Sequence, residues 1–300
     1  MSAKIISGKE LAQSLRAELA DEVAELQSKH NVSPGLAVIL VGENPASMSY
    51  VTAKGKAAKE LGVYSEQHDM PADTSEADLL AMIDKLNKDE KIHGILVQLP
   101  LPDQIDEAKV LLAIDPDKDV DGFHPVNVGR MVLGQPAFLP CTPHGVVQML
   151  NRSGYDPEGK HVVVVGRSNI VGKPVAMMLI QKAKGRNATV TICHTRTKDL
   201  GAMTRQADIL IVAAGKANAV TADMVREGAV VIDVGVNRIP DASKKRGFRL
   251  VGDVDFEAVK EKAEAISPVP GGVGPMTITM LMYNTVVSAK RKLGIGTTNE

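Results

Sequence analysis

The sequence predicts an α/β protein with two α/β domains around a cleft, the second a Rossmann-like, doubly wound parallel sheet. The chain has 300 residues, and about 150 residues per domain is the usual proportion. Short apolar segments alternate with segments of helical periodicity, which predicts parallel strands covered by helices on both faces. A glycine-containing turn at 166–172 joins one such strand to a helix.

The composition is that of an ordinary globular protein. Hydrophobic residues make up 44% and charged residues 24% of the chain, which argues against disorder. Lys and Arg number 35 against 36 Asp and Glu, so the basic excess of a nucleic-acid surface is missing. Four Tyr, four Phe and no Trp leave few side chains for stacking on single-stranded bases. We therefore expect no nucleic-acid partner.

The cysteines and the N-terminus indicate a reduced, soluble, cytoplasmic protein. Cys141 and Cys193 are too few, in contexts too different, for a disulfide framework or a zinc site, and we expect no metal. The N-terminus lacks the long apolar stretch of a signal peptide. No run of 18 apolar residues is present to span a membrane, so we expect no membrane partner.

The first half of the chain begins with a predicted helix. Ser7 and Glu10 have the spacing of a capping box, and the apolar residues that follow recur every three or four positions. The elements expected after this helix are buried strands at 36–41 and 92–99 and helices at 47–61 and from 74 onward.

The second half repeats this alternation more sharply. Strands are expected at 161–165, 188–193, 208–213 and 229–234, with a short fifth at 250–253, and helices at 175–183 and 276–293. Pro and Gly punctuate the stretch 140–157, where we place the domain boundary. The first domain is then 1–145 and the second 146–275. We expect the final helix, within 276–300, to pack back on the first domain.

The turn at 166–172 is the candidate phosphate-binding loop. A strand-to-helix turn presents backbone N–H groups and the positive end of the helix dipole to an anion. Ser168 stands where the second glycine of G-x-G-x-x-G would be, and Pro174 where a P-loop would have its Mg-binding hydroxyl. The alternative is a plain tight turn, which the surrounding strand–helix–strand pattern disfavours.

The end of the next strand favours NADP over NAD. NAD sites usually carry a carboxylate there for the ribose 2′-hydroxyl, whereas this chain has Thr195 and Arg196. A hydroxyl and a cation suit a 2′-phosphate, and Arg167 in the loop adds a second positive charge. Arg196 alone would be interpreted as a solvated surface residue, so the prediction depends on Arg167 and the missing acid.

A tyrosine and a lysine mark a candidate catalytic face in the first half. Tyr50 and Lys54 lie four positions apart in a predicted helix and therefore share a face. In short-chain dehydrogenases such a pair follows the Rossmann turn, whereas here it precedes Gly166, which argues against that class. An amphipathic helix with a snorkelling lysine is the structural alternative.

Three further features are candidates for the same cleft. Gln98 ends a predicted strand, where polar groups of a parallel sheet face the ligand. Asp121 lies in a turn-forming run, where the alternative role is an Asx turn. The Pro- and Gly-rich bend at 268–275 either brings backbone close to a ligand or is a plain linker.

These segments together resemble the bifunctional methylenetetrahydrofolate dehydrogenase/methenyltetrahydrofolate cyclohydrolase family. The matching motifs follow the family's order over nearly the whole chain, at 49–54, 94–102, 118–122, 140–143, 166–174 and 268–277. The resemblance implies a homodimer formed through the cofactor domain, NADP as cofactor and tetrahydrofolate derivatives as substrates. It also implies a place in one-carbon metabolism, which supplies purine, methionine and histidine biosynthesis.

The resemblance further implies a role for each candidate residue. Lys54 matches the catalytic lysine, and Gln98 matches the glutamine beside it. Tyr50 matches the tyrosine that packs against the folate, and Asp121 the aspartate that binds the pterin. The remaining matches are Gly166, Arg167 and Ser168 in the cofactor loop, Thr195 near the 2′-phosphate, Val236 at a backbone contact to the cofactor, and Pro270, Gly271 and Gly272 in the substrate-binding bend.

The implied reactions are NADP-dependent oxidation of 5,10-methylenetetrahydrofolate to the 5,10-methenyl form and hydrolysis of that form to 10-formyltetrahydrofolate. The cationic methenyl product lowers the pKa of a nearby Lys54, whose neutral amine then acts as general base. Two alternatives stay open. One is a shikimate-dehydrogenase-like NADP oxidoreductase, which would not need Asp121 or Tyr50, and the other is a dinucleotide-binding sensor without turnover.

Overall fold

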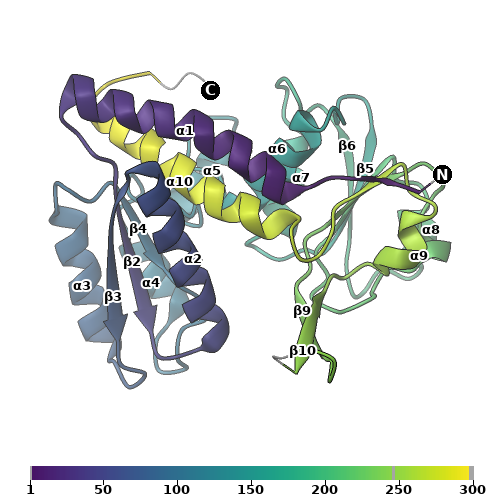
Figure 1. Cartoon of the computed structure of the whole chain (residues 1–300), viewed down its shortest axis with the longest axis horizontal. Helices are drawn as coiled ribbons and strands as arrows, with labels where there is room; N and C mark the ends of the chain where they lie inside the picture. Colours follow the sequence, from purple (N-terminus) through teal and green to yellow (C-terminus); the bar gives the residue numbers. More distant parts are fainter. Residues whose placement is uncertain (1, 245–246, 297–300) are drawn as a thin grey trace. The chain divides into compact units, whose positions relative to one another are not determined.

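The computed structural model describes residues 2–244 and 247–296, and the chain divides into two compact units. The Lys54 unit comprises Gln13–Cys141 and the chain from Ile278 onward. The Gly166 unit comprises the chain up to Ala12 and Thr142–Thr277. Each unit contains a parallel sheet with flanking helices (Figure 1), so the predicted α/β class is confirmed.

The Lys54 unit has a three-stranded parallel sheet in the order β3-β2-β4. β2 (Gly35–Val41) is central and wholly buried, and β4 (Gly94–Val97) pairs with it, as the apolar runs predict. β3 (Tyr64–Met70) lies outside the predicted strands. It is an edge strand with mostly polar side chains, so it has no apolar run that would predict it.

Helices pack on this sheet. α1 (Gly8–His30) begins at the predicted capping box, where Ser7 Oγ accepts a 3.3 Å hydrogen bond from the N–H of Glu10. α3 (Glu76–Lys88) buries Leu79, Ile83 and Leu86 in a core shared with β2 and β4. The other helices here are α2 (Pro45–Leu61), α4 (Glu107–Ala113) and α5 (Pro125–Val132).

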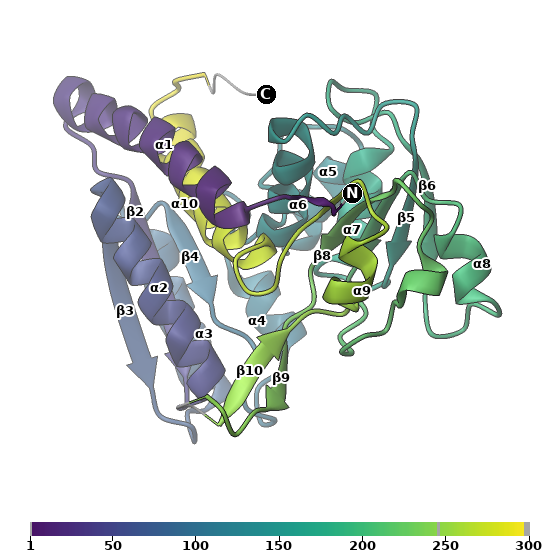
Figure 2. The same ribbon diagram turned by 45° about the vertical axis from the view of Figure 1, so that its right-hand side comes forward.

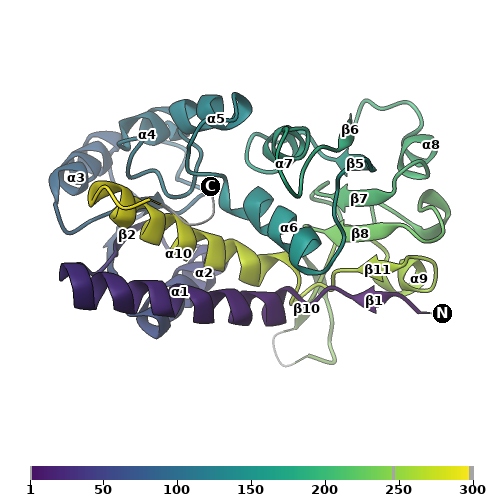
Figure 3. The same ribbon diagram turned by 90° about the horizontal axis from the view of Figure 1, so that it is seen from above.

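The last helix, α10 (Val273–Lys292), runs alongside α1 in the Lys54 unit (Figures 1 and 3). Lys290 Nζ forms an ion pair of 2.7 Å with Glu22. The hydroxyl of Ser288 donates to the carbonyl of His93, next to β4, at 2.6 Å. The end of the chain therefore contributes to the same packed unit as the first strands.

The Gly166 unit has a six-stranded parallel sheet in the order β1-β11-β8-β7-β5-β6 (Figure 3). The chain order reverses at β5, because β6 lies on one side of it and β7 on the other. Doubly wound sheets bind their ligands at such a switch point, beyond the carboxyl ends of the strands. The strands are β1 (Lys4–Ile5), β5 (His161–Val165), β6 (Thr189–Cys193), β7 (Ile209–Val212), β8 (Val230–Asp233) and β11 (Ala265–Ile266).

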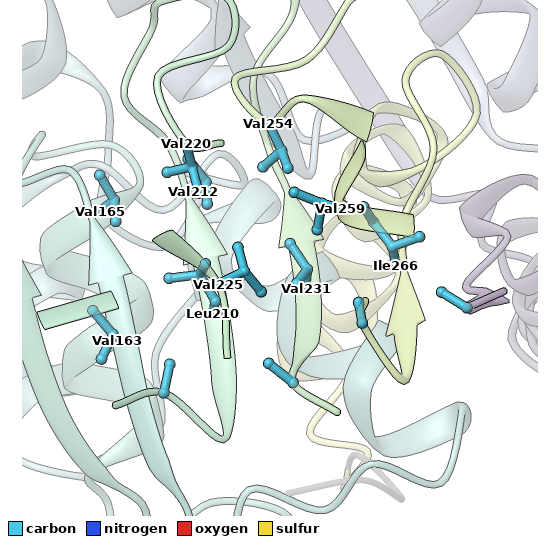
Figure 4. Packing of buried hydrophobic residues seen from close by; sticks show 14 of the residues in the cluster. Val163, Val165, Leu210, Val212, Val220, Val225, Val231, Val254, Val259 and Ile266 are labelled. Carbon is cyan, nitrogen blue, oxygen red and sulfur yellow. The ribbon is translucent and has the colours of Figure 1, made fainter. Parts of the chain in front are cut away.

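A layer of aliphatic side chains covers one face of this sheet (Figure 4). Val163, Leu210 and Val231 come from three neighbouring strands and are fully buried. Val225 and Val259 pack on them from the chain segments that cover the sheet. Continuous aliphatic strands of this kind are expected where both faces of a parallel sheet are covered.

Three elements of the Gly166 unit differ from the prediction. The short strand expected at 250–253 is β10 (Phe248–Val251), which pairs antiparallel with β9 (Asn237–Pro240) in a separate two-stranded ribbon (Figure 2). α7 (Gly172–Leu179) begins earlier than expected, because Pro174 fits into a first helical turn. α6 (Cys141–Arg152) occupies the stretch expected to be the domain boundary.

The unit boundaries also differ from the proposed domains. β1 pairs with β11, so the first residues of the chain belong to the Gly166 unit and not to the domain proposed at 1–145. A two-residue strand is too short to leave a periodic signal. The later boundary falls between Cys141 and Thr142. The remaining helices are α8 (Leu200–Thr204) and α9 (Phe256–Lys260). Within the described ranges no helix is long and apolar enough to cross a membrane.

Candidate active site

Lys54 is the centre of the candidate site in the Lys54 unit. It lies on α2 with only 7% of its surface exposed, although lysine is normally a surface residue. Its Nζ donates a 2.8 Å hydrogen bond to Oε1 of Gln98, which follows β4. The amide of Gln98 is itself held, because Nε2 donates to the carbonyl of Leu99 at 2.8 Å. The amine therefore has a fixed position and a neutral partner.

Tyr50 lies one helical turn before Lys54 on α2. Its side chain is 38% exposed, which leaves its ring available for contact. An exposed aromatic ring next to a polar site suits a planar ligand that stacks on it.

Asp121 lies in the turn after the bridge between Ile95 and Asp119. The alternative considered above, that Asp121 only shapes this turn, does not describe the geometry. Asp119 has that role, since its carboxylate accepts N–H bonds from Gly122 and His124 at 3.2 and 2.8 Å. Asp121 instead interacts electrostatically with Lys54 and Cys141.

The surroundings of the site disfavour the charged forms of its buried side chains. Burial lowers the pKa of Lys54, although the negative charge of Asp121 raises it. Burial likewise raises the pKa of Asp121, although the ammonium of Lys54 lowers it. The thiol pKa of Cys141 is raised well above its ordinary value, first by burial and then by Asp121. A neutral amine and a protonated thiol are thus favoured beside one carboxyl group.

Two residues at this site had no role in the sequence interpretation. Cys141 lies in the Pro-Cys-Thr-Pro motif at 140–143, and its Sγ contacts the carbonyl of Val120 at 3.3 Å. Asn284 on α10 donates from Nδ2 to the carbonyls of Val120 and Leu139 at 2.8 and 3.0 Å. Asn284 therefore ties the Asp121 turn to the segment before Cys141. The distance of Asn284 from these segments in the sequence left no signal that could have predicted this.

The Gly166 loop leaves β5 at the switch point of its sheet. Gly166 has a φ of +131°, and a Cβ there would lie 2.3 Å from the carbonyl oxygen of Ala213. A Cβ on Gly172 would lie 2.1 Å from the carbonyl oxygen of Gly166. Ser168 Oγ accepts bonds from the N–H groups of Val171 and Gly172 at 3.1 and 3.3 Å, which holds the turn just before α7. Only glycine allows this tight turn.

The other cofactor candidates lie on exposed parts of the same unit. Arg167 and Ser168 are exposed in the loop, and Thr195 is exposed in the turn after β6. Val236 follows β8 and is 51% exposed, which is high for a valine. These positions follow β5, β6 and β8, whose carboxyl ends lie at one edge of the parallel sheet.

The proline-rich bend joins β11 to α10 in the Gly166 unit. Pro270 is exposed and Gly271 has a φ of +102°. Gly272 is buried, and a Cβ on it would lie 2.5 Å from the carbonyl oxygen of Pro268. The bend is thus a tight backbone turn, fixed further by a 3.0 Å bond from the N–H of Lys9 to the carbonyl of Gly271.

Metal and disulfide chemistry find no support in the described part of the chain. No group of three or more His, Cys, Asp or Glu side chains is placed there to hold a metal ion. Cys141 and Cys193 are both free and buried.

The fold and site define a class: an α/β protein with a Rossmann-type strand-to-helix loop in one unit and a buried lysine beside a carboxylate in the other. The chain belongs to the tetrahydrofolate dehydrogenase/cyclohydrolase family. The family's catalytic-domain model matches residues 6–121, and its NAD(P)-binding-domain model matches residues 140–293.

Individual relatives cover nearly the whole chain. The bifunctional protein FolD of Syntrophus aciditrophicus is 63% identical over 295 residues, which are 98% of this chain and 100% of that protein. The FolD crystal structure from Campylobacter jejuni is 50% identical, covers 97% of this chain and 100% of its own, and gives a TM-score of 0.91. The Trypanosoma brucei FolD structure, complexed with NADP cofactor and inhibitor, is 40% identical to this chain. It covers 98% of this chain and 99% of its own, and the TM-score is 0.93.

Proposed function

We propose that this protein oxidises 5,10-methylenetetrahydrofolate with NADP and hydrolyses the resulting 5,10-methenyltetrahydrofolate to 10-formyltetrahydrofolate. The observation that carries the proposal is the buried amine of Lys54, 2.8 Å from Gln98 Oε1 and electrostatically coupled to Asp121. Membership of a family of dehydrogenase/cyclohydrolases supports the same pair of reactions. The shikimate-dehydrogenase-like and sensor alternatives are not favoured, since both leave this site without a use.

Asp121 and Tyr50 would bind the folate. A pterin edge presents N–H and NH₂ donors side by side, and one carboxylate accepts both as a bidentate pair. Asp121 is half-buried, which limits competition from water and strengthens such bonds. The exposed ring of Tyr50 is available to stack on the planar part of the substrate. The bend at Pro270, Gly271 and Gly272 is proposed to approach the substrate with its backbone.

Lys54 would carry the hydrolytic step. Water adds to the bridging methenyl carbon while the neutral amine of Lys54 takes a proton from it. The bond from that carbon to N5 then breaks as the remaining hydroxyl loses its proton to solvent and becomes the formyl carbonyl, and Lys54 returns its own proton to the leaving nitrogen. Gln98 keeps the amine aimed through the step, because its carbonyl oxygen accepts an N–H of either protonation state.

The Gly166 loop would hold NADP, which when bound accepts the hydride from the methylene carbon. The fit is structural: Gly166 and Gly172 allow backbone to pack too closely for any Cβ, and this tight turn leads directly into the N-terminus of α7. Arg167, Ser168 and Thr195 are exposed and offer a cation and hydroxyls to phosphate. Val236 offers its backbone at the end of β8.

The assembly and location are also proposals. We infer a cytoplasmic homodimer formed through the Gly166 unit, acting in the one-carbon metabolism that supplies purine, methionine and histidine biosynthesis. The open edge of the six-stranded sheet supports the dimer, since β6 has a neighbour on one side only. We expect light scattering to give twice the chain mass, and a monomer would contradict this part of the proposal.

One coupled assay tests the activity. Purified protein is given methylenetetrahydrofolate with NADP or NAD, while NADPH and methenyltetrahydrofolate absorbance are followed. We expect NADPH formation, a methenyl signal that decays by hydrolysis, and a weaker response with NAD. Cofactor binding without turnover would support the sensor, and a preference for NAD would contradict the roles given to Arg167 and Thr195.

A further inference from the structure

Two aspartates outside the proposed catalytic set are buried in the Gly166 unit. Asp233 is the last residue of β8 and is 2% exposed, and Asp253 follows β10 and is 0% exposed. Carboxylates are almost never buried this completely unless they are paired or fully hydrogen-bonded. Both carboxylates accept hydrogen bonds from backbone N–H groups, and Asp253 also accepts one from a side-chain amide. Their role is therefore to hold the surrounding backbone.

Asp253 fixes the turn after β7. Its Oδ2 accepts N–H bonds from Ala214 and Gly215 at 2.6 and 2.8 Å. The neighbouring Ala213 is the residue whose carbonyl oxygen closes on Gly166, and its own N–H bonds to the carbonyl of Val165 at 2.8 Å. The carboxylate therefore determines the shape of the backbone that faces the Gly166 loop across the switch point.

The two aspartates also fix both neighbours of Val236. Asp233 Oδ1 accepts the N–H of Gly235 at 2.9 Å, and Asp253 Oδ1 accepts the side-chain amide of Asn237 at 2.8 Å. The pair is tied together, because Asp233 Oδ1 also accepts the N–H of Asp253 at 3.0 Å. The exposed Val236 is thus held between two anchored residues.

The packing around the pair requires glycine. A Cβ on Gly235 would lie 2.2 Å from Cγ of Asp253, and a Cβ on Gly252 would lie 1.8 Å from Oδ2 of Asp233. The carboxylates therefore occupy space that only glycine leaves free on two separate segments. Val220 and Val254 form a bridge at the same end of the sheet as Val165 and Val212 (Figure 4).

We propose that Asp233 and Asp253 are positioning residues for the nicotinamide-cofactor site, holding the backbone after β7 and β8 in the conformation that accepts the dinucleotide. This inference rests on the proposed function. It assigns the pair no contact with the cofactor: the carboxylates act through Ala214, Gly215 and the residues on either side of Val236.

The experiment compares Asp253→Ala with Asp253→Asn in the full-length protein. The alanine variant removes the acceptor for Ala214 and Gly215, whereas the asparagine variant keeps one oxygen to accept these bonds. In NADPH titrations followed by fluorescence, we expect the affinity of Asp253→Ala to be at least tenfold weaker than that of the wild type. The loss of affinity in Asp253→Asn is expected to be smaller than in Asp253→Ala. Hydrolysis of supplied methenyltetrahydrofolate, which needs no cofactor, is expected to stay within twofold.

Asp255→Asn is the matched control, because Asp255 lies in the same segment but caps α9 by accepting the N–H of Ala258. We expect its cofactor affinity to equal that of the wild type. If Asp253→Ala does not fold, Gly235→Ala takes its place in the experiment, because the new Cβ displaces the same carboxylate. Unchanged NADPH affinity, or an equal loss of hydrolysis and cofactor binding, would overturn the proposal. Failure of the wild type to bind NADPH would instead overturn the proposed function.

Discussion

Lys54 Nζ donates its hydrogen bond to an amide oxygen, Oε1 of Gln98, at 2.8 Å. A carboxylate at this place would stabilise the ammonium form, whereas an amide adds no charge. Burial is then the main influence on Lys54 and lowers its pKa. The pairing therefore provides an amine that is fixed in direction and whose neutral form is favoured by burial, which is what a general base requires.

The first prediction separates the two activities by substitution at Lys54. In Lys54→Ala we expect cyclohydrolase activity to fall by about 10²–10⁴-fold, the usual contribution of a positioned acid–base group. Hydride transfer needs mainly alignment of two bound molecules and should fall far less. Lys56→Ala, on the same helix but with its side chain 79% exposed, is the control and should change neither activity. Equal losses in Lys54→Ala, with folate and NADP still bound, would contradict this division of roles.

The second prediction concerns pH. The lowered pKa of Lys54 means that the active neutral amine becomes available below the ordinary pKa of lysine, so the enzymatic hydrolysis rate should rise with pH through that ionisation. Asp121 raises this pKa, so Asp121→Asn should move the rise to lower pH. Gln98→Glu adds a carboxylate and should move it to higher pH.

The measurement is the enzymatic rate of methenyltetrahydrofolate hydrolysis against pH, after subtraction of the uncatalysed rate at each pH. The wild type and the two variants are compared at saturating substrate. If Asp121→Asn and Gln98→Glu shift the profile in the same direction, Lys54 is not the group that titrates.

The third prediction tests the cofactor loop through Gly166. In Gly166→Ala the new Cβ would lie 2.3 Å from the carbonyl oxygen of Ala213, at a φ of +131° that side chains rarely adopt. We expect NADPH binding and dehydrogenase activity to be lost while hydrolysis of supplied methenyltetrahydrofolate persists. Gly129→Ala, with nothing within 4 Å of its Cβ, is the control. Retained NADPH affinity in Gly166→Ala would exclude this loop as the dinucleotide site.

The fourth prediction is a stability change at Asn284. Asn284→Ala leaves the carbonyls of Val120 and Leu139 without this donor. A buried group left unsatisfied costs about 1–3 kcal/mol, so the free energy of unfolding in urea should fall by about that amount or more. The Michaelis constant for the folate substrate should also rise, because Asp121 follows Val120. Lys292→Ala removes a half-exposed ion pair with Glu90 and should change the unfolding free energy by less than about 1 kcal/mol. Equal effects of the two substitutions would show that Asn284 has no special role.

The fold could be predicted where buried segments have a simple period. Buried strands and one-sided helices meet the same surroundings along their whole length, so their sequence patterns are regular. Examples are the apolar runs of β2, β5, β7 and β8 and the apolar stripe of α1. β3 is an edge strand with polar side chains, and β1 has two residues, so neither leaves a signal. β10 has a strand pattern, but which partner it pairs with depends on the hairpin with β9.

The sequence by itself determined the α/β class, the buried strands, the glycine turn at Gly166 and the candidate set of Lys54, Gln98 and Asp121. These are local: spacing within a helix, an apolar run, or a residue at a strand end. The family resemblance implied that Gln98 lies beside Lys54, and the tertiary structure supplied the bond between them. Tertiary structure alone decided that Asn284 holds the turn before Asp121 and that Asp233 and Asp253 share one network. Each of these contacts joins segments distant in the chain, and local periodicity carries no information about which distant groups meet.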